Sequence, residues 1–385
     1  MSPVWYSRKG SAVVLIALLV LLSLSYSATR DGGYHYMGPW RTRPSSSFRE
    51  MLSTVLPSDR APHSKTLGVS GKIYVIGLPG RADRRSEMEK LQDAMDITFT
   101  WHNATDMHSP AIGTILERIR HARAAARGGH EGEHPNPEAY PFAWPADAHS
   151  REPLQRDDIA GSELWFLPQH AAGRLPPLKP VPVPDTRPVE HVAQGNNEPN
   201  PDWPLKPVEI SCWHSHFEVL RKIADGDDDV ALIFEDDIDM EFDLDRRLRS
   251  VWPFLPADGW DMVMLGHCQS NEASQPAVKG TSYLYPSTMT MCTHGYAVSK
   301  KGAAALVRML RTPLFAYSRP IDHAYTHLKW NGMLNQFSMY PAVVVQSKTT
   351  MSDIGDGTGP DEDFFLMDSA LARVHAWESQ NDRAV

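Results

Sequence analysis

One segment near the middle of the chain constrains the fold most: the apolar run Val230–Phe234 ends directly in a cluster of carboxylates. Five apolar residues with branched and aromatic side chains are typical of a strand that is buried on both faces. Glu235, Asp236 and Asp237 follow at the carboxyl end of this strand. Because ligands bind outside the carboxyl ends of strands in open α/β sheets, the segment predicts a negatively charged site at a sheet edge.

An alternation of strand and helix patterns begins well before this run. Ile73–Ile76 is a short strand pattern closed by Gly77, residues 81–95 form an amphipathic helix pattern, and residues 99–101 form a second strand pattern. This β-α-β order predicts an α/β fold with a parallel sheet. Further strands are expected at residues 261–265 and 340–345, and further helices at 112–126, 211–223, 302–310 and 364–377.

The N-terminus carries the pattern of a membrane anchor. Arg8 and Lys9 precede an apolar run at residues 11–28, which as a helix is about 27 Å long and just spans a thin bilayer. The basic pair favours a cytoplasmic tail at residues 1–10, with the polar residues 29–70 as a lumenal stem. A cleaved signal peptide is the alternative. Either interpretation places the remaining chain in the secretory pathway.

The chain from residue 71 to 352 is expected to form the main domain, with an acidic tail at residues 353–385. Residues 107–206 interrupt its alternating pattern and hold many of the 31 prolines of the chain. After the helix at 112–126 we expect this insertion to have little regular structure. A long irregular segment of this kind either covers a site or is a surface excursion without a catalytic part.

Net charge and cysteine content narrow the class of protein. The formal net charge of -9 gives no electrostatic reason to expect nucleic acid as a partner. The chain contains three cysteines, Cys212, Cys268 and Cys292, without a C-x-x-C pair, so a zinc knuckle is not expected. In an oxidising lumen Cys268 and Cys292 could pair and leave Cys212 free. Three unpaired thiols are the alternative.

The carboxylates at residues 235–237 have a chemical use at a sheet edge. Negative groups this close together repel one another, and a hard divalent cation with oxygen ligands relieves the repulsion. Mn²⁺ or Mg²⁺ takes one or two carboxylates and completes its coordination shell with diphosphate oxygens. The alternative is an acidic turn that is solvated and inert.

Taken together, several segments resemble glycosyltransferase family 25, which includes lipopolysaccharide and collagen galactosyltransferases. The hallmark of that family is the acidic motif, which here is Leu232–Asp237. The chain departs from the family pattern at Ser211, where glycine is usual, and at Gly77, where asparagine is common. The other matching segments are residues 73–85, 104–106, 209–216, 260–266, 293–303, 320–322 and 341–346.

The resemblance implies a GT-A fold, which is a Rossmann-like sheet that binds a nucleotide-sugar together with a metal ion. It implies transfer of a sugar, with galactose and a UDP-sugar donor expected, to a glycan or glycoprotein acceptor in the Golgi or endoplasmic reticulum. Asp236 and Asp237 would hold Mn²⁺ or Mg²⁺, with Glu235 as a further ligand or as support. For Asp239 we favour a structural role. A catalytically silent glycan- or partner-binding protein on the same fold is the alternative.

The resemblance also suggests residues for donor binding. Arginine suits phosphate because its guanidinium is planar and forked, but arginines at a helix N-terminus can equally be solvated charges. A histidine in this position can equally be a satisfied core residue. His214 and His216 lie two residues apart on one expected helix, so they should point to different sides. The expected donor-binding residues are Arg81, Arg84, Arg85, Asp106, Ser215 and His216.

An inverting transfer needs a general base to take the proton of the acceptor hydroxyl. Asp322, which follows Pro320 and precedes a helical stretch, is the expected base. It could instead cap that helix, because aspartate is favoured at helix N-termini.

Overall fold

The computed structural model describes residues 63–126, 144–154, 205–257, 259–268, 271–312, 315–347 and 366–382. The predicted cytoplasmic tail, the apolar run at 11–28 and nearly all of the stem lie outside these residues, as does most of the insertion. Among the helices of the described ranges, none is long and apolar enough to cross a membrane. The prediction of a membrane anchor therefore stays a prediction.

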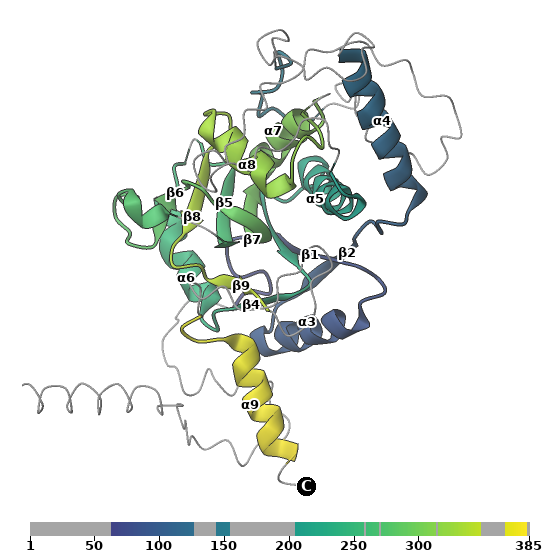
Figure 1. The fold of residues 1–385 in the computed structure, drawn as a ribbon. Helices are drawn as coiled ribbons and strands as arrows, with labels where there is room; N and C mark the ends of the chain where they lie inside the picture. The colour runs from purple at the N-terminus through teal and green to yellow at the C-terminus, as the bar shows by residue number, and fades with distance from the viewer. Residues whose placement is uncertain are drawn as a thin grey trace, which may run out of the picture. The chain divides into compact units, whose positions relative to one another are not determined.

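A seven-stranded sheet forms the centre of the fold (Figure 1). Its order is β2-β1-β3-β7-β5-β8-β6, with β1 parallel to β2 and β3, and β5 parallel to β8. β7 runs antiparallel to both of its neighbours, β3 and β5, and β6 is antiparallel to β8. The strands are β1 (Lys72–Gly77), β2 (Phe99–Asn103), β3 (Val230–Glu235), β5 (Met262–Cys268), β6 (Leu284–Pro286), β7 (Met291–Ser299) and β8 (Gln336–Met339).

The α/β class is confirmed, and the expectation of a parallel sheet is corrected: the sheet is mixed. A second, two-stranded antiparallel sheet joins β4 (Ile238–Met240) to β9 (Val344–Gln346). The strand expected at 340–345 is found only at its end, where β9 begins at Val344, while β8 ends before it at Met339 and belongs to the other sheet. Pro341 lies between them and has no N–H to contribute to a strand ladder, which explains the break.

Helices cover the sheet. A continuous apolar core joins one face of β1, β3, β5 and β7 to α5, α7 and α8, while α9 packs against α3 (Figure 1). The helices are α3 (Ala82–Met95), α4 (Pro110–Ala126), α5 (Pro207–Asp225), α6 (Leu244–Val251), α7 (Lys300–Leu310), α8 (Ile321–Trp330) and α9 (Ala370–Asp382). The four helices expected at 81–95, 112–126, 211–223 and 302–310 are confirmed, and the one expected at 364–377 begins six residues later.

Local chemistry explains where two of these helices begin. α5 starts with Pro207, whose fixed φ suits a first helical turn, and the Glu209 carboxylate accepts a hydrogen bond from the Lys206 N–H at 2.7 Å. At the start of α7 the Ser299 hydroxyl accepts a hydrogen bond from the Gly302 N–H at 2.9 Å. Gly302 is required there, because a Cβ would lie 2.3 Å from the carbonyl oxygen of Asp261.

The insertion has one described segment after α4, residues 144–154, which forms turns without helix or strand. Buried Arg308 of α7 holds it, donating hydrogen bonds to the carbonyl oxygens of Ser150 at 3.0 Å and Glu152 at 2.8 Å. Arg151 makes a bidentate ion pair with buried Asp261 at 2.8 and 2.6 Å. This part of the insertion is therefore anchored to the domain.

We expect Arg308→Met to lower the free energy of unfolding by about 2–3 kcal/mol, because it removes the buried charged donor that binds the carbonyl oxygens of Ser150, Glu152 and Pro153. Chemical denaturation measures the loss. Lys301→Met, on the exposed side of the same helix, should change stability by no more than about 0.5 kcal/mol. Equal losses in the two variants would contradict the anchoring.

Candidate active site

The acidic motif lies where β3 ends and the chain turns into β4. β3 is enclosed between β1 and β7, and its residues from Ala231 to Phe234 are fully buried. The carboxylates that follow do not form one group: Glu235 contacts α5 and β7, whereas Asp236 and Asp237 contact α3. The motif therefore serves two adjoining clusters with different partners.

The first cluster pairs two buried carboxylates with a buried arginine. Arg84 Nη1 donates to Asp236 Oδ1 at 2.8 Å and lies 3.1 Å from Asp237 Oδ2. Gln346 Nε2 also donates to Asp237 Oδ2, at 2.9 Å. Arg84 is thus the counter-ion of Asp236 and Asp237. It could bind a diphosphate as well only if a metal ion neutralised part of the charge of these two carboxylates.

Asp237 has the features of a cation ligand. Its Oδ1 is buried and has no hydrogen-bond partner among the described residues. Burial raises the pKa of Asp237 to about 7, with a further rise from the charge of Glu235, against the opposing effects of Arg84 and Gln346. Burial also raises the pKa of Asp236, although Arg84 opposes it. A hard dication would satisfy the orphaned oxygen and offset the charge, so these residues fit Mn²⁺ or Mg²⁺.

The second cluster is built around Glu235. Thr293 Oγ1 donates to Glu235 Oε1 at 2.7 Å, and His216 Nε2 lies 3.4 Å from the same oxygen. Burial alone would raise the pKa of Glu235, but the hydrogen bond and charge of His216 and the hydrogen bond of Thr293 lower it to about 2. His216 Nδ1 in turn lies 2.9 Å from the hydroxyl of Tyr296. Glu235 is therefore held ionised as support beside the acidic pair.

Of the arginines expected at the donor, Arg84 donates a hydrogen bond to the acidic motif, at Asp236. Arg81 hydrogen-bonds the Asp83 carboxylate at 3.0 and 2.9 Å. Its positive charge also opposes the rise that burial causes in the pKa of Asp236. Arg85 lies over the Trp101 ring, 4.3 Å from its centroid, and pairs with Glu89 at 3.2 Å. The structure thus separates Arg85 from the other two.

Ser215 and His214 bind the turn that follows β2. The buried Ser215 hydroxyl accepts a hydrogen bond from the Thr105 N–H at 2.9 Å, and His214 Nδ1 lies 2.8 Å from Thr105 Oγ1. Ser211, at the position where the family pattern has glycine, donates to the Thr105 carbonyl oxygen. Ser215 therefore positions the turn, and His214 and His216 have different partners as expected.

Asp106 lies on that turn and is exposed. Its Oδ1 accepts a hydrogen bond from the His108 N–H at 2.8 Å, which shapes the approach to α4. Its expected contact with the donor stays a prediction.

Asp322 lies in the first turn of α8 and accepts two backbone hydrogen bonds. Its Oδ2 accepts from the Cys292 N–H at 2.9 Å and its Oδ1 from the His323 N–H at 2.8 Å. Both interpretations of this residue therefore remain open: the carboxylate helps to order the start of α8, and it lies half-buried beside the start of β7.

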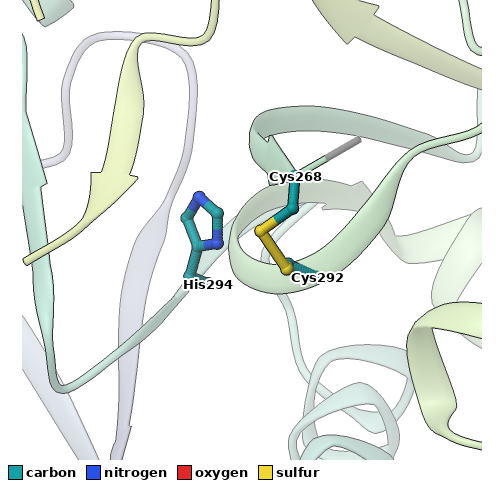
Figure 2. A group of neighbouring side chains, drawn as sticks. All are labelled: Cys268, Cys292 and His294. Carbon is teal, nitrogen blue, oxygen red and sulfur yellow. A yellow bond between two sulfur atoms is a disulfide. The ribbon is translucent and has the colours of Figure 1, made fainter. Parts of the chain in front are cut away.

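A disulfide joins Cys268 at the end of β5 to Cys292 at the start of β7, with a Cα–Cα distance of 5.5 Å, and Figure 2 shows it beside the ring of His294. Cys212 is the free cysteine. Of the two alternatives for the cysteines, the Cys268–Cys292 pair is the one found. The disulfide fixes the start of the strand that carries Thr293 to Glu235.

Asp239 belongs to neither cluster. Its Oδ1 accepts a hydrogen bond from the Leu371 N–H at 3.1 Å, and its Oδ2 accepts one from the Ser369 hydroxyl. Buried Glu241 accepts hydrogen bonds from the N–H groups of Met367 and Asp368 at 2.8 and 2.9 Å. The structural role favoured for Asp239 is confirmed: it attaches the segment before α9.

Sequence reasoning missed three residues that shape the site: Gln346, Thr293 and Tyr296. Each lies within a segment that resembles the family, but no local pattern marks its side chain. Gln346 meets Asp237 across 109 residues and Thr293 meets Glu235 across 58, so only the folded chain reveals the contacts.

The mixed α/β sheet and the buried carboxylates at the end of its central strand define a class: a Rossmann-like domain of the glycosyltransferase kind. Residues 183–323 match the model of glycosyltransferase family 25 (LPS biosynthesis protein). The match covers less than half of the chain and supports a glycosyltransferase that is similar to this family. The match includes the acidic motif and Asp322, whereas Arg84 and Gln346 lie outside it.

Curated proteins similar to the chain include galactosyltransferases and relatives named as inactive. Procollagen galactosyltransferase 1-A of Xenopus laevis is 29% identical over 161 residues, which are 38% of this chain and 26% of that protein. Procollagen galactosyltransferase 2 of Mus musculus is 26% identical over 204 residues, 48% of this chain and 32% of that protein. The probable inactive glycosyltransferase 25 family member 3 of Bos taurus is 26% identical over 159 residues, 38% of this chain and 27% of that protein. The matches thus span about a quarter to a third of each relative's own length.

Proposed function

We propose that the protein transfers a sugar from a nucleotide-sugar donor to a hydroxyl group of a glycan or glycoprotein acceptor. The donor is a UDP-sugar, with galactose as the sugar, and the reaction requires Mn²⁺ or Mg²⁺ and inverts the anomeric centre. Galactose is favoured because similar proteins are named procollagen galactosyltransferases. The observation that carries the proposal is the buried Oδ1 of Asp237, which lies beside Arg84 at the end of β3 and has no hydrogen-bond partner within the described ranges.

The charged residues at the end of β3 and the start of α3 have different roles in this reaction. Asp237, with Asp236, holds the metal ion, which when bound offsets the charge of the donor diphosphate and of the departing UDP. Arg81 and Arg84 add positive charge at the same edge. Glu235, ionised and held by Thr293 and His216, keeps the turn in place.

Asp322 is the proposed general base. It takes the proton of the acceptor hydroxyl as the acceptor oxygen bonds to the anomeric carbon and the bond from that carbon to UDP breaks. The carboxylate can accept this proton because each of its oxygens has a second lone pair besides the one bound by a backbone N–H. In the absence of acceptor these hydrogen bonds keep it in position.

We also propose that the apolar run at residues 11–28 anchors the chain as a single-pass type II protein of the Golgi or endoplasmic reticulum, with the catalytic domain in the lumen. The Cys268–Cys292 disulfide supports this placement, because disulfides persist in oxidising compartments.

The proposal is tested by measuring UDP release from UDP-galactose with the purified lumenal part of the chain. We expect release to require Mn²⁺ or Mg²⁺, to stop with a chelator and to resume when the metal is restored. UDP-glucose and UDP-N-acetylglucosamine are assayed in the same way, as donors that differ from UDP-galactose only in the sugar. UDP release at the same rate in the presence of chelator would show that the reaction needs no metal ion. Faster release from another UDP-sugar would show that galactose is not the preferred donor sugar.

A second candidate is a catalytically silent protein that binds glycans or a partner. The observation in its favour is the similarity to a relative named as probably inactive. Calorimetry separates the two functions: binding of a glycan acceptor without any binding of UDP-galactose in the presence of Mn²⁺ would favour the silent protein.

A further inference from the structure

Three side chains of the kinds that bind metals converge at Glu235, the first carboxylate of the acidic motif. The proposed function uses Glu235 and His216 only as support and does not use Cys212. Cys212 and His216 lie four residues apart on α5 and so share one face of the helix, and Glu235 reaches them from the end of β3. The Cys212 sulfur, one His216 ring nitrogen and one Glu235 oxygen all lie within 4.8 Å of one another.

The geometry of this cluster is close to that of a tetrahedral metal site. His216 Nε2 and Glu235 Oε1 are 3.4 Å apart, and two such ligands around zinc are separated by about 3.3 Å, given metal–ligand distances near 2 Å. The other ring nitrogen of His216 is held by the Tyr296 hydroxyl at 2.9 Å. Metal-binding histidines are usually oriented by a hydrogen bond of this kind on the second nitrogen.

We propose that Cys212, His216 and Glu235 form a binding site for a thiophilic divalent cation of the zinc class, distinct from the hard-cation site at Asp236 and Asp237. A thiolate and an imidazole select zinc and cobalt over manganese and magnesium. The three side chains supply three ligands, and the fourth position stays open to water. Binding displaces the proton of the Cys212 thiol and replaces the contact between His216 and Glu235.

The surroundings favour a cation. Negative charges of Glu235, Asp322, Glu209 and Asp237 all act on the Cys212 sulfur. Cys212 and Glu235 are half-buried and His216 is buried, so the cluster lies at the edge of the core.

The other Cys/His cluster of the described chain is chemically different. Cys268 and Cys292 lie beside His294, but their sulfurs are bonded to each other (Figure 2). Since the whole chain has three cysteines, Cys212 is the one that can supply a thiolate while the disulfide is intact. A signal from a metal–thiolate bond under non-reducing conditions therefore reports on Cys212.

The experiment uses cobalt as the spectroscopic probe. Co²⁺ is titrated into the purified, non-reduced protein, and the sulfur-to-cobalt charge-transfer band in the near ultraviolet is recorded. We expect the band to appear and saturate at one equivalent, to disappear on addition of Zn²⁺ and to survive an excess of Mn²⁺. We expect Cys212→Ser to lose the band completely and His216→Asn to weaken it.

Two results would overturn the proposal in the unaltered protein, whatever the variants do: no thiolate band at saturating Co²⁺, or a band that an excess of Mn²⁺ removes. A band that survives in folded Cys212→Ser would also overturn it. Asp237→Asn should keep the full band, because Asp237 belongs to the other site. The cobalt band reports on the Cys212 site and UDP release reports on sugar transfer, so either result can fail without the other.

Discussion

An Asp237→Asn variant is expected to transfer sugar about 10²- to 10³-fold more slowly than the unaltered protein, which is the usual cost of removing one electrostatic contact to a developing charge. Asparagine keeps the shape of the side chain and can keep the contact with Gln346, but it removes the charge that holds the cation. Steady-state release of UDP from UDP-galactose measures the effect. Raising the Mn²⁺ concentration should recover part of the lost rate, because the defect is in metal affinity.

The free energy of unfolding of Asp237→Asn, unlike its rate, should not fall. Burial raises the pKa of Asp237 to about 7, above its value of about 3.8 in the unfolded chain, so the ionised carboxylate opposes folding once the pH rises above its unfolded pKa. Removing the charge should leave the metal-free protein at pH 8 as stable as before, or more stable. An inactive variant that unfolds more easily would instead point to a structural role for Asp237.

Asp227→Asn is the matched control for this variant. It makes the same change of carboxylate to amide at an exposed residue of the loop before β3, at the opposite end of the strand from the acidic motif. Its rate and metal requirement should equal those of the unaltered protein. An equal loss of rate in the two variants would mean that general charge, and not the site, sets the rate.

An Arg84→Met variant is expected to lose about 3–5 kcal/mol of stability in the absence of metal. Methionine preserves much of the apolar volume of the arginine but leaves the buried carboxylates of Asp236 and Asp237 without their counter-ion. Since a divalent cation would supply the missing positive charge, Mn²⁺ should raise the melting temperature of this variant more than that of the unaltered protein. Thermal unfolding with and without Mn²⁺ measures both effects.

Arg85→Met is the comparison for Arg84→Met. Arg85 is the next residue on α3, but it lies over Trp101 and pairs with exposed Glu89, so its removal should cost no more than about 1 kcal/mol. Its response to Mn²⁺ should be unchanged. An equally small loss of stability in Arg84→Met and Arg85→Met would contradict the role of Arg84 as the counter-ion of Asp236 and Asp237.

Periodic patterns predicted elements that bury an apolar face along their length. The run at 230–234 and the helix at 211–223 carry enough apolar residues at the right spacing to be identified locally, and both are confirmed. β7 shows why the sheet was only partly predicted. Its residues entered the sequence analysis only within a segment that resembles the family, and its antiparallel direction depends on pairing with β3 and β5, which no local pattern encodes.

The acidic motif shows the same limit at the level of a site. The sequence places Glu235 next to Asp236, and sequence reasoning grouped them as one ligand set. Glu235 is the last residue of β3 and turns to His216, whereas Asp236 begins the turn that follows and faces Arg84. The partner of Asp236 could not be read from the sequence, because Arg84 lies 152 residues away in the chain.

The central claim is that Asp237 holds a cation against a nucleotide diphosphate at the end of β3. Calorimetry of UDP binding with and without Mn²⁺, on the unaltered protein and on Asp237→Asn, tests it most directly. We predict that UDP binds the unaltered protein tightly only with Mn²⁺, and that Asp237→Asn loses this dependence together with most of its affinity. Equal affinity for UDP in all four measurements would contradict the claim.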